Sequence, residues 1–138
     1  MFYGCTSLTT APALPATTLA GNCYNQMFRS CSSLVTAPTL PATTLQLYCY
    51  SGMFRDCINL TSAPELPATT LVSNCYSQMF YGCTKLNYIK ALFTTDPSGY
   101  NYLTDWVNGV SATGTFVKNS SATWNVTGNN GVPSGWTV

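Results

Sequence analysis

The feature that most constrains this chain is a 26-residue period that runs through about its first two thirds. The run Ala-Pro-x-Leu-Pro-Ala-Thr-Thr-Leu occupies 11–19, 37–45 and 63–71, and the three full repeats agree at about half of their positions without an insertion. A Met-Phe pair recurs once in each repeat, at Met1, Met27, Met53 and Met79. Equal side chains at a fixed period are typical of units that bury their apolar sides only against their neighbours, so the period predicts stacked coils.

The order of residues within a repeat predicts the path of one coil. The segments 7–11, 33–37 and 59–63 each follow a cysteine and indicate one rung of a parallel sheet. The two prolines that come next lack an N–H group, so we expect them at the bend that leaves the rung. Tyr24–Phe28 contains no breaker and predicts a single helical turn. The apolar positions expected to form ladders inside the stack are Leu8, Leu14, Leu19 and Phe28 with their equivalents.

The spacing Phe-x-x-Cys-x-x-Leu, followed by an apolar-proline step, resembles the BspA-like leucine-rich repeats of bacterial surface proteins over about 1–93. The tail resembles endings seen on such proteins in gut bacteria and their phages. The resemblance implies a leucine-rich-repeat solenoid of right-handed parallel β coils with short helical turns. It also implies a cell-surface or secreted adhesion protein, with a virion as the alternative location. The chain departs from the commoner repeat by placing cysteine at Cys23, Cys49 and Cys75.

The repeat decays after its fourth Met-Phe pair. Lys90 stands where the first proline is expected, and Phe93 takes the place of the second. We therefore expect a solenoid over 1–93 and a β-rich C-terminal cap over 94–138, because terminal repeats must present a polar outer face. Three tryptophans are spaced through this tail, and we expect them to cover the last coil.

The chain begins in the middle of a repeat, so the first coil would have an unpaired edge, and such edges invite pairing with another chain. We expect either a fragment of a longer protein or an edge that docks on a partner subunit or a second copy. The first five residues have neither the basic nor the apolar segment of a signal peptide.

The seven cysteines alternate at spacings of 18 and 8 residues, and two interpretations stay open. Free cysteine is among the most buried residue types, so all seven can form apolar ladders. Alternatively, an oxidising compartment would favour disulfides eight residues apart, namely Cys23–Cys31, Cys49–Cys57 and Cys75–Cys83. A metal site is not expected, because the chain has no histidine and no C-x-x-C pair.

Composition argues against several function classes. Charged residues make up 7% of the chain and the net charge is +1, so no basic surface for nucleic acid is expected. No apolar run approaches the length of a membrane span. The chain lacks histidine and has only four acids, so neither a nucleophile-base pair nor a paired-carboxylate site is indicated, and we expect neither an enzyme nor a cofactor.

Binding is the function that remains, because solenoids recognise ligands through positions that vary from coil to coil over a constant frame. One such column contains tyrosine and arginine, which are common at interface hot spots. The candidate binding residues are Tyr3, Arg29, Arg55, Tyr81, Leu47, Tyr48, Glu65 and Tyr88. The sequence therefore predicts a non-catalytic scaffold that binds a protein or glycan. The alternative is a structural component of a larger assembly, such as a phage tail or fibre, docked through its open N-terminal end.

Overall fold

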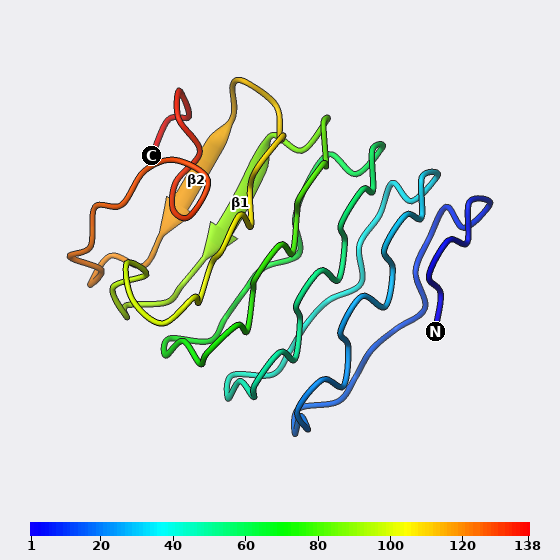
Figure 1. Cartoon of the computed structure of the whole chain (residues 1–138), viewed down its shortest axis with the longest axis horizontal. Helices are drawn as coiled ribbons and strands as arrows, with labels where there is room; N and C mark the ends of the chain where they lie inside the picture. Colours follow the sequence, from blue (N-terminus) through cyan, green and yellow to red (C-terminus); the bar gives the residue numbers. More distant parts are fainter.

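In the computed structural model, which describes residues 1–138, the chain winds through a row of coils that lie side by side (Figure 1). Regular secondary structure is almost absent. There is no helix, and the two strands are β1 (Tyr88–Ala91) and β2 (Thr115–Lys118). They pair in parallel, with Tyr88 opposite Thr115 and Ala91 opposite Lys118. The chain accordingly has no helix that could cross a membrane.

The predicted fold class is wrong. The structure is not a leucine-rich-repeat solenoid with helical turns and a β-rich cap, because it has no helix and only two strands of four residues each. The prolines give one reason. The first three repeats carry two prolines in this region, which removes N–H donors that a strand ladder needs. β1 forms in the fourth repeat, where Lys90 replaces the first of these prolines.

The predicted helical turn at Tyr24–Phe28 is also absent, because its N–H groups point to two different partners. Tyr24 and Phe28 donate to the next coil, at Cys49 O (3.0 Å) and Met53 O (2.9 Å). Met27, between them, donates within its own coil to Tyr24 O (3.2 Å). In a helix the Phe28 N–H group would bond to Tyr24 O, four residues earlier, and not to the next coil. The alternating pattern instead builds a run of turns.

We call this run the turn band, defined as residues 20–31, 46–57 and 72–83. Every fourth residue in the band has a left-handed backbone; in the first coil these are Asn22, Gln26 and Ser30, with φ of 59°, 55° and 60°. Each backbone hydrogen bond between coils of the band runs from an N–H group to a carbonyl of the following coil. The band is therefore directional along the row of coils.

A single core of 34 buried residues runs through the whole chain, from Leu14 to Trp136. Its most regular part is a stack of four phenylalanine rings, one from each coil, with neighbouring centroids 5.5, 5.7 and 5.9 Å apart. Leu14, Leu19 and Phe28 are buried, as expected, whereas Leu8 in the first coil is only half-buried.

The same core continues into 94–138 through the three tryptophans, which are all buried. Each indole N–H group donates to a backbone carbonyl distant in sequence. The pairs are Trp106 to Gly131 O (2.9 Å), Trp124 to Phe93 O (3.1 Å) and Trp136 to Ser111 O (2.7 Å). Both the ring and its polar atom are satisfied, so the tryptophans are structural.

Candidate binding surfaces

Four of the predicted binding residues form one continuous column on successive coils, which we call the Arg-Tyr column: Tyr3, Arg29, Arg55 and Tyr81. The Arg29 guanidinium carbon lies 5.3 Å from the centroid of the Tyr3 ring. The Arg55 guanidinium carbon lies 4.6 Å from the Tyr81 ring. Both separations are within the range of a cation–π contact. The two cations therefore occupy the middle coils, and a tyrosine flanks each of them on the outer side.

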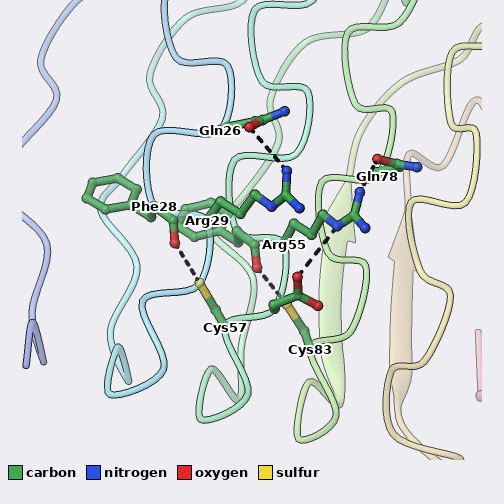
Figure 2. A network of polar contacts seen from close by, with 9 residues as sticks. Gln26, Phe28, Arg29, Arg55, Cys57, Gln78 and Cys83 are labelled. Atoms are coloured by element: carbon green, nitrogen blue, oxygen red, sulfur yellow. Dashed lines mark hydrogen bonds and ion pairs between the residues drawn. The ribbon is translucent and has the colours of Figure 1, made fainter. Parts of the chain in front are cut away.

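Glutamines of the turn band fix both guanidinium groups (Figure 2). Arg29 Nη1 donates to Gln26 Oε1 at 3.3 Å, and Arg55 Nη1 donates to Gln78 Oε1 at 2.7 Å. The local turn brings Arg29 and Gln26 together, because Arg29 N–H also donates to Gln26 O at 3.2 Å. Each guanidinium group is thus held by a tyrosine ring on one face and by a glutamine at one edge of its plane.

The Arg-Tyr column has more positive than negative charge. Asp56 is the only acid paired with it, at 3.5 Å from Arg55 Nε, and Arg29 has no ion-pair partner. The contact between Arg55 and Asp56 is an ion pair and not a hydrogen bond, because Arg55 Nε has no hydrogen-bond partner. Arg29 Nε is likewise buried without a partner. The remaining guanidinium N–H groups can receive a planar or tetrahedral anion, which is the group that arginine recognises best.

Glu65 and Tyr88 lie on a different surface, beside a shallow groove between the second and third coils. One part of the groove has a volume of about 270 Å³ and is lined mainly by four prolines and Glu65. No backbone hydrogen bond joins 35–41 to 61–67, whereas Val35 N–H donates to Thr9 O and Asn87 N–H donates to Thr61 O on either side. Glu65 is already paired with Lys90 at 3.2 Å. The groove is therefore a break in the inter-coil pairing.

Leu47 and Tyr48 are exposed on a third surface, at the start of the turn band. Tyr48 belongs to a column with Asn22, Asn74 and Tyr100, and all four residues have positive φ. Sequence reasoning missed Asn74 and Tyr100. The period does align them with Tyr48, but nothing in the sequence marks this column as left-handed.

All seven cysteines are free, and the three disulfides eight residues apart are not formed. Cys31 instead donates its thiol proton to the carbonyl of Phe2, at 2.9 Å. Cys57 and Cys83 donate to the carbonyls of Phe28 and Phe54, at 3.1 and 3.0 Å (Figure 2).

Burial raises the pKa of Cys49 to about 11, and those of Cys57 and Cys75 to about 12. These thiols are therefore protonated near neutral pH and are poor nucleophiles. No group of three or more His, Cys, Asp or Glu side chains is placed to hold a metal ion.

The structure thus separates the predicted binding residues into three surfaces: the Arg-Tyr column, the groove with Glu65 and Tyr88, and the exposed pair Leu47 and Tyr48. Only the Arg-Tyr column brings several of them into direct contact. No protein-family model, curated protein or solved structure matches this chain.

Proposed function

We propose that this chain is a non-catalytic binding scaffold, secreted or exposed at a cell surface, that recognises an anionic group of a protein or glycan through the Arg-Tyr column. The observation that supports this proposal is the placement of two fixed guanidinium groups on adjacent coils. Only one carboxylate is paired with them, so the column keeps a net positive charge. A second anion would balance the remaining charge.

The fixed geometry favours binding because less side-chain freedom is lost when the ligand arrives. A guanidinium plane offers two parallel N–H groups to a carboxylate, sulfate or phosphate. Tyr3 is 56% exposed, so its ring extends the surface beside Arg29. The ligand group that fits is an anion next to an apolar or stacking surface.

The carboxylates support a binding role over a catalytic one, because three of the four have structural partners. Asp56 pairs with Arg55, and Glu65 pairs with Lys90. Asp96 Oδ1 accepts a hydrogen bond from the Ser98 N–H group at 2.9 Å, and this bond lowers the pKa of the Asp96 carboxyl. A general acid would need the opposite shift.

The test is a double variant, Arg29→Gln and Arg55→Gln, assayed against an immobilised sulfated glycan and an immobilised acidic peptide. We expect the wild type to bind one of the two and to bind it more weakly as salt is added, because screening weakens exposed charge pairs. The double variant should lose at least about tenfold in affinity, since hydrogen bonds to charged groups contribute on the order of 1.5–3 kcal/mol each.

Lys85→Gln is the matched control, because it removes one positive charge from an exposed side chain that is bonded only to Asn59. It should bind as the wild type does. Equal binding by the wild type and the double arginine variant, with both folded by circular dichroism, would contradict the proposed function. Binding to the sulfated glycan or to the acidic peptide shows which of the two supplies the anion.

A further inference from the structure

Two tyrosines occupy backbone positions that suit them poorly. Asn22, Tyr48, Asn74 and Tyr100 form one column on four successive coils, which we call the Tyr-Asn column, and their φ values are 59°, 55°, 56° and 45°. Asparagine tolerates the left-handed region, whereas a bulky side chain is uncommon there and strained. The first and third coils therefore carry a residue that fits, and the second and fourth carry one that does not.

Packing does not account for the two tyrosines. Tyr48 is 37% exposed and Tyr100 is 81% exposed, so neither ring belongs to the core. Tyr100 contacts one aromatic ring, Tyr102, with centroids 6.1 Å apart, and Tyr48 stacks on none. Strained residues that no internal contact requires are typical of functional sites.

The surroundings of this column carry no charge. The segments 20–26, 46–52, 72–78 and 98–104, which form this side of the coils, contain no acidic or basic residue. The polar groups there are amides and hydroxyls. Asn74 lies between the two tyrosines, and its Nδ2 donates to Ser73 Oγ at 3.1 Å, which orients the amide. Leu47, beside Tyr48, is 46% exposed and extends the apolar surface.

We propose that Tyr48, Asn74 and Tyr100 form a platform for a neutral β-1,4-linked polysaccharide. The tyrosines are two coils apart; in the neighbouring stack of Tyr24, Tyr50 and Tyr76, successive ring centroids are 5.9 and 6.0 Å apart, so two coils correspond to about 12 Å. A β-1,4-linked chain presents the same face at every second sugar, with a comparable repeat. Each ring would stack on the C–H face of one such sugar, and the Asn74 amide would bond the hydroxyls of the sugar between them.

This proposal rests on the general role of a binding scaffold but not on the Arg-Tyr column, so the two can fail separately. The variants are Tyr48→Asn and Tyr100→Asn, singly and together, which introduce the residue that the first and third coils already use. We expect the melting temperature to stay the same or to rise, because asparagine suits the left-handed backbone. Affinity for a cello- or chito-hexasaccharide, measured by calorimetry, should fall at least about tenfold in the double variant.

Ile58→Asn is the matched control, since Ile58 is an apolar residue, 45% exposed, that lies outside all three candidate surfaces. It should leave the affinity unchanged. A wild type that binds neither hexasaccharide overturns the proposal, and so does a double tyrosine variant that becomes more stable and binds as before. The double arginine variant in the same assay should bind the hexasaccharide normally, and its loss of binding would place the sugar on the other column instead.

Discussion

At the scale of single residues, the cysteine after each Phe-containing turn has two properties that the position requires. It is small and apolar enough for a fully buried site, and its thiol donates to a backbone carbonyl of the preceding coil, as Cys57 does to Phe28 O at 3.1 Å. Valine would fill a similar volume without a donor, and serine would bring a more strongly solvated group into the core.

Thiol alkylation should separate the cysteines into two classes. Cys5 and Cys23 are exposed and the other five are buried, so iodoacetamide at mildly alkaline pH should add two adducts to the native protein and seven to the unfolded one. The thiolate is the reactive form, and burial disfavours it in Cys49, Cys57 and Cys75. Peptide mass spectrometry would read out the sites. Modification of Cys57 as fast as Cys5 in the folded protein would contradict the buried ladder.

At the scale of elements, the turn band shows how far the sequence can predict this structure. The period identifies which side chains stack, because any coil with a constant rise places equivalent residues over one another. It does not determine the backbone between them. Tyr24–Phe28 lacks breakers and so predicts a helix, yet its alternate N–H groups bond to the next coil. That preference comes from contacts between coils, which no single repeat contains.

The candidate site was predictable to the same extent. The period places Arg29 and Arg55 on adjacent coils, and the structure keeps them there. The cation–π contacts with Tyr3 and Tyr81 depend on side-chain directions that spacing does not give. The left-handed Tyr-Asn column was hidden for a related reason, because a tyrosine at such a position gives no sign of its backbone conformation.

The tail depends on close backbone approach at Gly131, which is buried and whose carbonyl accepts the Trp106 indole N–H group. A Cβ atom there would overlap the carbonyl group of Val126. We expect Gly131→Ala to lower the free energy of unfolding by about 1–3 kcal/mol or more, as overpacking of a rigid site does.

Gly21→Ala is the matched control for this substitution, because its added Cβ would meet only the Leu47 carbonyl oxygen, at an ordinary 3.5 Å. It should raise the free energy of unfolding by a few tenths of a kcal/mol to about 1 kcal/mol. Urea denaturation of both variants provides the comparison. Equal midpoints for Gly131→Ala and the wild type would show that the tail can adjust without loss.

At the scale of the whole molecule, one core joins all the coils and contains no buried charged side chain. Titratable thiols and phenols are nevertheless part of that core. Burial raises the pKa of Tyr50 and Tyr76 as well as those of the buried cysteines. The fold therefore depends on these groups staying neutral.

Stability should fall in alkaline solution. The cysteine thiols have an ordinary pKa of 9.0, and in the folded chain Cys49 has a pKa of about 11 and Cys57 and Cys75 have values of about 12. Above pH 9 the unfolded chain releases protons that the folded chain retains, so the free energy of unfolding decreases as pH rises towards 11–12. The stability that the neutral thiols contribute is fully present below pH 9. Urea midpoints measured from about pH 8 to about pH 11 would test this, and a flat profile would contradict it.

The directional bonding of the turn band has a geometric consequence for any contact made through the ends of the row. In the backbone bonds between coils of the band, donors such as the Tyr24 and Phe28 N–H groups all face one way, and the carbonyls that accept them face the other. Two like ends brought together by a twofold axis would oppose oxygen to oxygen or hydrogen to hydrogen. Pairing along this edge is consequently restricted to a head-to-tail arrangement, the heterologous type that extends instead of closing on itself.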